Sequence, residues 1–343
     1  MTVKTAVIGL GIMGQRMLEH VMRHEGFTPV ALWDPSPEAC AAAAKLAPEV
    51  EITASAEAAI AAADLVYLAC PPVPRKAYAL AAAAAGKAVF LEKPLGVDIA
   101  ESEALVAALE ASGVPAAVNF TQAAGAALSD ISAAAQAGEL GDLVGVDMVV
   151  TYTNWPRPWQ VAADWLRFRD EGGMTREVIS HFLFFTQRIF GPLTVVWSRP
   201  SYPSDPQLCE TALLARLETA AGQPVSILAS VGGAQRDRQE FTIKGSTASH
   251  RVADFSDVSI STGGDFVAVD KLDLRIPHKT IYGFLGPNGC GKSTSMRLIT
   301  GLLTPSAGSV RVLGMEIPEH AELLRRRLGY MTQKFSLYDD LTV

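Results

Sequence analysis

Short apolar runs alternate with stretches of helical spacing over the first 120 residues. Residues 4–8 are apolar and β-branched, whereas apolar residues recur at helical spacing in residues 15–23. The alternation continues through the Ala-rich stretches that follow. We therefore predict helices at residues 15–23, 37–46, 56–63 and 75–85, and strands at residues 4–8, 27–32, 51–52, 65–69, 88–91 and 115–118. This order is typical of an α/β domain with a doubly wound parallel sheet.

The pattern changes after residue 118 and again near residue 263. Runs at residues 144–152, 193–197, 211–217, 224–231 and 240–244 alternate or are rich in β-branched residues. They predict an α+β domain with a mainly antiparallel sheet and helices on one face. Further on, we predict strands at residues 281–285 and 309–313 around a helix at residues 293–302. These changes divide the chain into residues 1–118, 119–262 and 263–343.

Composition narrows the class of protein. The chain has 343 residues, 49% of them hydrophobic, which is enough for two domains and a fragment. Its net charge of -7 argues against nucleic acid as the main partner. Its cysteines show no CxxC or His-paired spacing, so neither a disulfide framework nor a zinc site is indicated. No export signal or membrane-length apolar run is found, and we expect a cytoplasmic protein.

The first candidate site is the glycine-rich sequence GLGIMG at residues 9–14. It follows directly on a predicted strand and leads into a predicted helix. Glycines let the backbone turn tightly and approach a pyrophosphate, which the N–H groups at the helix start favour. The expected contacts are Gly9, Gly11, Ile12, Met13 and Gly14. This arrangement predicts a dinucleotide-binding Rossmann domain.

Asp34 follows the second predicted strand, about 20 residues after the last glycine of the loop. A carboxylate at this place accepts hydrogen bonds from the ribose hydroxyls and repels a 2′-phosphate. No arginine follows in WDPSP to accommodate such a phosphate. We therefore predict NAD in preference to NADP.

Four short motifs stand out along the first 260 residues: Cys70-Pro71-Pro72 after a strand, Glu92-Lys93-Pro94, the GELG sequence at residues 138–141, and WLR at residues 165–167 ahead of two glycines. With these motifs the sequence resembles the glucose-fructose oxidoreductase/inositol dehydrogenase/MocA (Gfo/Idh/MocA) family of NAD(P)-dependent dehydrogenases. The match covers roughly residues 1–260. The resemblance implies that Lys93 contacts substrate and nicotinamide ribose and that Pro94 follows a cis peptide bond. It also implies that Cys70, Pro71 and Glu92 lie at the cofactor.

The position of Lys93 after a predicted strand supports an interpretation of its own. A lysine at the carboxyl end of a parallel strand points into the crevice where ligands bind, and it can steady or protonate a reacting atom. The alternative is a surface lysine paired with Glu92.

Glu177 and His181 are separated by one helical turn and so share a face. The family carries Asp and His at these places, and the resemblance implies that His181 transfers the proton while Glu177 orients the site. Here Glu replaces Asp, which lengthens the acid by one methylene. A helical histidine is also commonly a packing residue, and that alternative stays open.

Other residues of the second domain allow two interpretations. Trp155, Trp159 and Trp165 could line a pocket with Arg167 and Arg169, or they could pack in the core, which is the commoner role. Asn119 could close the cofactor site or cap a turn.

From about residue 264 the sequence resembles the front half of an ABC-transporter ATPase. In GPNGCGKST the backbone N–H groups would cradle phosphates, Lys292 would reach the β and γ oxygens, and Ser293 would offer its hydroxyl to magnesium. The resemblance adds Gln333 as a contact of the metal. Mg-ATP is thus a second candidate ligand, with contacts from Gly286, Asn288, Gly289, Gly291, Lys292, Ser293, Thr294 and Gln333.

The sequence after Gln333 contains no LSGGQ signature, catalytic glutamate or switch histidine. We therefore expect ATP binding without efficient hydrolysis. Two incomplete patterns meet near residue 263, which indicates a chimera or mis-joined reading frame. The strands predicted at residues 281–285 and 309–313 would lack sheet partners and leave apolar surface or open edges.

The leading functional hypothesis is an NAD(P)-dependent oxidoreductase that transfers hydride between nicotinamide and a small carbonyl, hydroxyl or imine substrate. Its second-domain sheet is a candidate surface for homo-oligomerisation. The alternative is the ATP-binding subunit of an ABC transporter, whose partner would be a membrane subunit.

Overall fold

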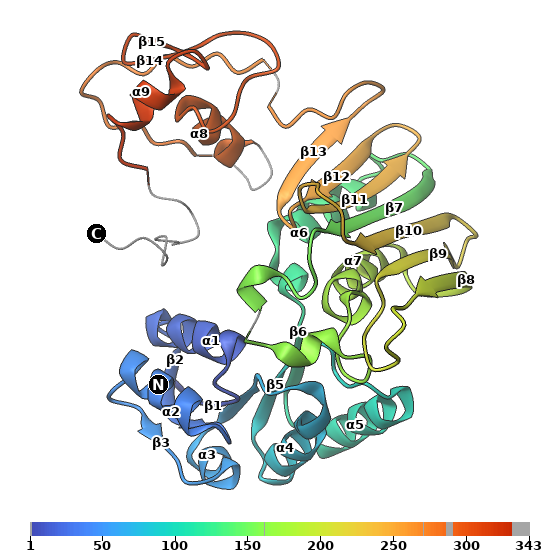
Figure 1. Ribbon diagram of the computed structural model, residues 1–343. Coiled ribbons are helices and arrows are strands. Elements are labelled where there is room, and N and C mark those ends of the chain that lie inside the picture. The colour runs from blue at the N-terminus through green and yellow to red at the C-terminus, as the bar shows by residue number, and fades with distance from the viewer. Residues whose placement is uncertain (1, 161, 270, 286–290, 331–343) are drawn as a thin grey trace.

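The computed structural model describes residues 2–160, 162–269, 271–285 and 291–330. Its strands form a six-stranded sheet (sheet A), a seven-stranded sheet (sheet B) and a two-stranded hairpin. Figure 1 shows sheet A near the N-terminus, sheet B in the middle of the chain and the hairpin in the C-terminal part.

Sheet A is parallel throughout, in the order β3-β2-β1-β4-β5-β6, and confirms the doubly wound prediction. The strands are β1 Val3–Ile8, β2 Phe27–Trp33, β3 Glu51–Ile52, β4 Leu65–Leu68, β5 Ala88–Glu92 and β6 Ala116–Asn119. The helices are α1 Ile12–Arg23, α2 Pro37–Leu46, α3 Ala56–Ala62, α4 Pro72–Ala84 and α5 Ile99–Ser112.

Successive side chains of each strand in sheet A enter two separate cores. Ala6 and Ile8 pack with residues of α3, α4 and α5 on one face. Val7 packs with α1 and α2 on the other. This is the period of two that a strand buried on both faces requires. The small residues of the Ala-rich helices, such as Ala59 and Ala79, are fully buried against the sheet.

Sheet B has the strand order β13-β12-β11-β7-β10-β9-β8. Only the β7–β10 pair is parallel, so the prediction of a mainly antiparallel sheet is confirmed. The strands are β7 Leu143–Tyr152, β8 Leu193–Ser201, β9 Ala212–Thr219, β10 Pro224–Val231, β11 Arg238–Gly245, β12 Ser249–Ala253 and β13 Asp257–Ser261.

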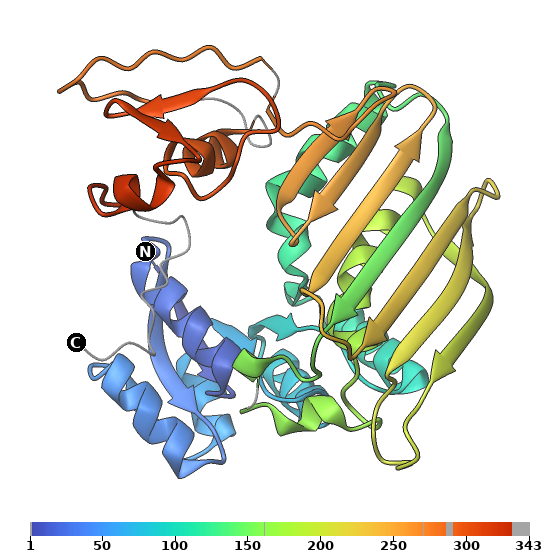
Figure 2. The same ribbon diagram turned by 45° about the horizontal axis from the view of Figure 1, so that its top comes forward.

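The helices α6 Ala126–Gln136 and α7 Ser180–Phe190 cover one face of sheet B and complete its core. Within the described ranges no helix covers the opposite face (Figure 2), where Trp197, Leu214 and Leu228 are each 47–48% exposed. Short helical segments supply the loops between the sheets: η1 Thr121–Ala124, η2 Pro158–Gln160, η3 Asp164–Arg167 and the π-helical η4 Thr175–Ile179.

The C-terminal part contains α8 Lys292–Ile299, the hairpin of β14 Val310–Val312 and β15 Met315–Ile317, and α9 Ala321–Arg325. It adjoins the end of sheet B (Figure 1), where Ile260 and Val267 exchange backbone hydrogen bonds and Arg297 pairs with Asp257 at 3.1 Å.

One prediction for this part is wrong, because residues 281–285 form no strand. The side chains of Ile281 and Leu285 are 102% and 94% exposed. A strand needs a hydrogen-bonded neighbour, and none of the described residues supplies one here. The expectation of exposed apolar surface in this part is therefore confirmed. The segment at 309–313 does form a strand, paired within the short hairpin. No helix in the described ranges has the length and apolar character needed to span a bilayer.

Candidate functional site

The three glycines of the loop after β1 have different roles. Gly9 has φ +93°, and a Cβ there would lie 2.4 Å from the Cys70 backbone N. A Cβ on Gly14 would lie 1.8 Å from the Gly9 carbonyl oxygen. Gly11, the residue before α1, has nothing within 4 Å of such an atom and no side-chain cap. Two glycines therefore permit close packing, while the third keeps the helix start accessible to a phosphate.

The Asp34 carboxylate is held at the end of β2. Its Oδ2 accepts the Leu10 backbone N–H at 2.6 Å, and its Oδ1 accepts the Ser36 N–H at 2.8 Å. These bonds fix the acid beside the glycine loop, as the predicted ribose contact requires. Glycine loop, helix start and carboxylate together fit a dinucleotide.

Arg75, which no motif of the sequence indicates, holds together the loop after β4 and the loop after β5. Its side chain is 2% exposed, and it donates to the carbonyl oxygens of Glu92 (2.6 Å), Pro94 and Cys70. Burial lowers the pKa of the guanidinium, while Cys70 and Glu92 act in the opposite direction. Arg75 thus joins the loop at Cys70 and Pro71 to the end of β5.

Glu92 is 5% exposed and points into the protein. Its carboxylate accepts the Tyr67 hydroxyl and the Asn119 side-chain N–H, the latter at 2.6 Å. Burial, followed by the charge of Glu92, raises the pKa of Tyr67, so the phenol stays a donor. Asn119 therefore belongs to the cluster around Glu92.

Lys93 follows Glu92 and joins the end of β5 to η4. Its Nζ donates to the Glu177 carbonyl oxygen at 2.9 Å and to the Glu177 carboxylate. The side chains of Lys93 and Glu177 are only 9% and 16% exposed. The interpretation of Lys93 as a surface residue paired with Glu92 is therefore wrong. The peptide bond between Lys93 and Pro94 is cis, as the resemblance implied.

The second carboxylate oxygen of Glu177 faces residues of the segment around η2. Gln160 Nε2 donates to it at 3.2 Å, and Arg157 Nη2 lies 3.9 Å away. Gln160 in turn accepts Arg157 Nε–H at 2.8 Å. A lysine, an amide and a guanidinium therefore surround this one carboxylate.

His181 lies in the first turn of α7 and is 6% exposed. Its ring makes edge contacts with Phe120 and Phe255, and its Nδ1 has no hydrogen-bond partner among the described residues. Burial, and then the charges of Lys93 and Arg157, lower the pKa of His181 to about 3. The imidazole is neutral at pH 7 and can accept a proton. Within the described chain, no hydrogen bond joins it to Glu177.

The three tryptophans divide between the two interpretations of their sequence. Trp155 is partly buried and packs against the core of sheet B, as the core interpretation predicts, whereas Trp159 is exposed. Trp155 donates to the Leu166 carbonyl oxygen at 3.0 Å, and Trp159 is 47% exposed. The guanidinium of Arg157 lies 4.6 Å from the Trp159 ring centroid. Arg157 thus takes the position that we considered for Arg167 and Arg169. Its place in the run WPRPWQ, between two tryptophans, is the signal that could have identified it.

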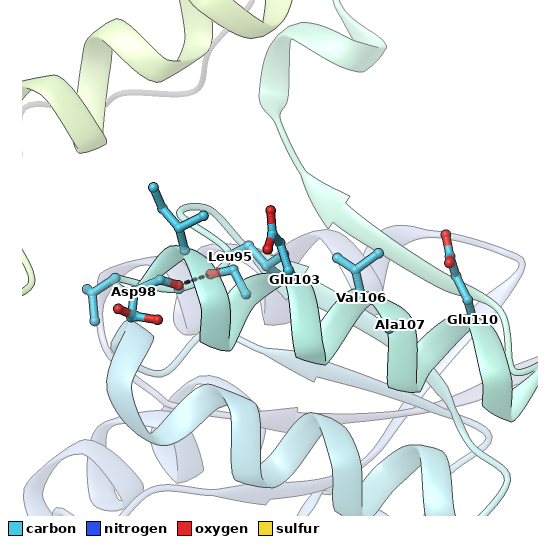
Figure 3. Close-up of a pocket in the computed structure, with 10 residues that line it drawn as sticks. Leu95, Asp98, Glu103, Val106, Ala107 and Glu110 are labelled. Carbon is cyan, nitrogen blue, oxygen red and sulfur yellow. Dashed lines mark hydrogen bonds between the residues drawn. The ribbon is translucent and has the colours of Figure 1, made fainter.

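Two surface hollows lie away from this chemistry. A hollow of about 510 Å³ runs along α5 and the loop before it. Figure 3 shows Asp98, Glu103 and Glu110 around it, with the bond from Ser102 to the Asp98 carbonyl oxygen dashed. Three carboxylates repel a pyrophosphate, so this hollow is no cofactor site. The second hollow, about 390 Å³, lies on sheet B beside Trp197.

The second candidate site is described in part. Gly291 has φ +81° and precedes α8, the helix that begins at Lys292 and carries Ser293 and Thr294 in its first turn. This matches the predicted helix start after a phosphate loop. The other predicted ATP contacts, Gly286, Asn288, Gly289 and Gln333, lie outside the described residues.

Three family models match successive parts of the chain. A family described as "Oxidoreductase family, NAD-binding Rossmann fold" matches residues 3–120, and the "GFO/IDH/MocA C-terminal domain" matches residues 129–251. Residues 3–251 belong to the Gfo/Idh/MocA oxidoreductase family. The family described as "ABC transporter" matches residues 269–343. Both resemblances stated from the motifs are confirmed.

Solved structures share the oxidoreductase fold. The WlbA dehydrogenase from Bordetella pertussis, in complex with NADH and UDP-GlcNAcA, has a TM-score of 0.68 and 23% identity over 75% of this chain and 79% of its own. An oxidoreductase from Agrobacterium radiobacter, in complex with NAD+, L-tartaric acid and magnesium, has a TM-score of 0.69 and 15% identity over 87% of both chains. At such identities the likeness concerns the fold.

Curated relatives match the C-terminal part. The probable multidrug ABC transporter ATP-binding protein YbhF of Escherichia coli is 50% identical over 80 residues, which are 23% of this chain and 14% of that protein. The Nod factor export ATP-binding protein I of Rhizobium etli is 44% identical over 90 residues, 26% of this chain and 28% of that protein. The chain therefore spans less than a third of either relative.

Proposed function

We propose that residues 3–261 form an NAD-dependent dehydrogenase, which transfers hydride between nicotinamide and a carbonyl, hydroxyl or imine carbon of a small substrate. The observation that supports this most directly is the contact of Lys93, at the end of β5, with Glu177, one helical turn before His181. The end of β5 thus meets η4 and α7 of the second domain at the carboxyl edge of sheet A, where ligands of such folds bind.

The glycine loop and Asp34 would bind the cofactor. Bound NAD supplies the hydride acceptor. Gly11 leaves the start of α1 open to its pyrophosphate, Gly9 and Gly14 let the turn pack closely, and Asp34 accepts the ribose hydroxyls. The favoured cofactor is NAD, because the carboxylate of Asp34 repels a 2′-phosphate.

His181 and Lys93 handle the proton of the substrate. His181 is neutral and accepts the hydroxyl proton as hydride leaves the adjacent carbon. Lys93 donates a hydrogen bond to the reacting oxygen and stabilises the charge that develops on it. Glu177 orients Lys93 through two hydrogen bonds.

Titration of the protein with NADH, followed by nicotinamide fluorescence, tests this assignment. Asp34→Ala should weaken NADH binding about tenfold, because it removes the acceptor for the ribose. The matched control Asp64→Ala removes an acid from the same sheet, where it accepts the Lys4 N–H, and should leave NADH affinity unchanged. Equal affinity in wild type and Asp34→Ala would contradict the proposed site.

A second candidate function follows from the ABC family match over residues 269–343. In this alternative the chain binds Mg-ATP through Lys292, Ser293 and Thr294 and acts with a membrane subunit. Lys292→Ala separates the two: it should abolish any ATP binding and leave NADH affinity unchanged. ATP binding without NADH binding would make the alternative the better description.

We also propose that a second copy of this chain covers the exposed face of sheet B. Trp197, Leu214 and Leu228 line that face together with the 390 Å³ hollow. Light scattering should report a dimer or larger assembly that Leu228→Lys dissociates; a monomer in the wild type would refute this.

The described cysteines, Cys40, Cys70 and Cys209, are all free, and this supports a cytoplasmic location.

A further inference from the structure

The charged side chains that meet at Glu177 include more cations than anions. Lys93 and Arg157, whose side chains are 9% and 11% exposed, both face the single carboxylate of Glu177. His181, their neighbour, is neutral at pH 7. Among the described ion pairs, Glu177 is the one carboxylate that these two cations share, so it balances about one of their two charges at a place where water screens poorly.

The side chain of Arg157 is held in place, but only part of its hydrogen-bonding capacity is engaged. Its Nε–H is bonded to Gln160 at 2.8 Å, and its guanidinium carbon lies 4.6 Å from the Trp159 ring centroid and 5.3 Å from that of Tyr152. Within the described residues no hydrogen bond reaches its two terminal nitrogens, whose nearest carboxylate oxygen is 3.9 Å away. The side chain is thus held at its stem while its planar fork remains available.

Such a fork matches one chemical group well. A guanidinium offers two parallel N–H donors that fit the two oxygens of a carboxylate, and this bidentate geometry is the strong form of the interaction. A neutral hydroxyl or amide would leave the excess charge uncompensated. The buried Nδ1 of His181, which has no partner among the described residues, separately indicates that a polar group of a ligand lies here.

We propose that the substrate of this site carries a carboxylate, which the terminal fork of Arg157 binds while its reacting hydroxyl lies toward His181 and Lys93. This rests on the proposed dehydrogenase function and names the substrate class as hydroxy or sugar acids. Trp159 stacks between Arg157 and Arg16, 4.9 Å from the latter, and so connects the acid-binding residue to α1 beside the glycine loop.

Binding of the acid has a consequence for proton transfer. Burial is the main cause of the low pKa of His181, and the charges of Lys93 and then Arg157 lower it further. A carboxylate on Arg157 offsets part of this smaller contribution of charge and so raises the pKa of the imidazole. The substrate's own charge therefore makes His181 a better base.

The test is a binding comparison on the NADH-saturated full chain by calorimetry. The probes are L-tartrate, D-gluconate and D-glucuronate, each against its neutral amide. We expect at least one acid to bind about 10- to 100-fold more tightly than its amide, the range for charge-assisted bonds. Arg157→Gln should abolish this preference, and Arg157→Lys should retain a small part of it. The control Arg167→Gln, at a side chain 52% exposed, should keep it whole.

Each outcome is decisive. If NADH binds but no acid binds more tightly than its amide, including the case where none of the probes binds, the acid-binding inference is overturned and the dehydrogenase assignment stands. If the acid preference survives Arg157→Gln, Arg157 is not the binding residue. If NADH itself fails to bind, the proposed function fails first.

Discussion

The ion pair between Lys93 and Glu177 should couple the end of β5 energetically to η4 of the second domain. The residues are 84 positions apart, and their side chains are 9% and 16% exposed. Removing one partner of a fully buried pair costs about 3–5 kcal/mol, because the other charge is left uncompensated. The remaining solvent contact reduces this, and we expect Glu177→Gln to lower the free energy of unfolding by about 2–3 kcal/mol.

A double-mutant cycle isolates the pair itself. Lys93→Met, Glu177→Gln and the double variant should give a coupling energy of about 1.5 kcal/mol or more in urea unfolding followed by tryptophan fluorescence. The matched control is the exposed cross-strand pair of Lys244 and Asp147, which lie 2.7 Å apart with 40% and 41% exposure. Its cycle should give less than about 1 kcal/mol, since water screens it.

The comparison of the two cycles can refute this reasoning. If the Lys93–Glu177 coupling is no larger than that of the control pair, burial does not strengthen the interaction between β5 and η4. Salt provides a second criterion, because 1 M NaCl should weaken the exposed pair more than the buried one.

Three further predictions concern other parts of the chain. Arg75→Met should lower the free energy of unfolding by about 3 kcal/mol in urea titration, because buried carbonyl oxygens lose their donor; a change below 1 kcal/mol would contradict this. The lowered pKa of His181, about 3 against 6.5 unfolded, means that the unfolded chain binds more protons below pH 6.5. Stability is lost as the pH falls from 6.5 toward 3, by about 2 kcal/mol at pH 5, and His181→Phe should flatten the measured profile by that amount; an unchanged profile would show that His181 is not responsible. Trypsin should cut first near Arg275 and Lys279, both exposed, with mass spectrometry reporting a fragment that retains sheets A and B; equal resistance of the C-terminal part would oppose this.

The sequence predicted sheet A well because local signals and tertiary structure agree there. Residues 37–46 and 51–52 form the predicted helix and strand with the same bounds. Helix α4 begins at Pro72, three residues before its prediction, since a proline is tolerated in a first helical turn. Strands β12 and β13 were missed. They are short and carry polar residues, and the neighbouring strand supplies most of their stability.

The site was predicted less completely, for a physical reason. Motifs identified Lys93, Glu177 and His181, but their partners depend on contacts between distant segments. No local pattern tells that Lys93 meets Glu177 rather than its neighbour Glu92. Arg75 looked like an ordinary residue of an Ala-rich helix, although it is one of the largest fully buried side chains.

The strand predicted at residues 281–285 failed for the related reason that local β-propensity needs partners. Its apolar residues match the pattern of a buried strand, but the described chain provides no sheet beside them.

The double engagement of Asp34 constrains how cofactor preference can change. The same carboxylate that would select against a 2′-phosphate also holds the Leu10 N–H within the glycine turn. Replacing the acid to admit NADP would release that turn at the same time, so a second substitution would have to restore its shape. Evolution of this chain toward the phosphorylated cofactor therefore requires at least two linked changes, of which the first alone is a loss.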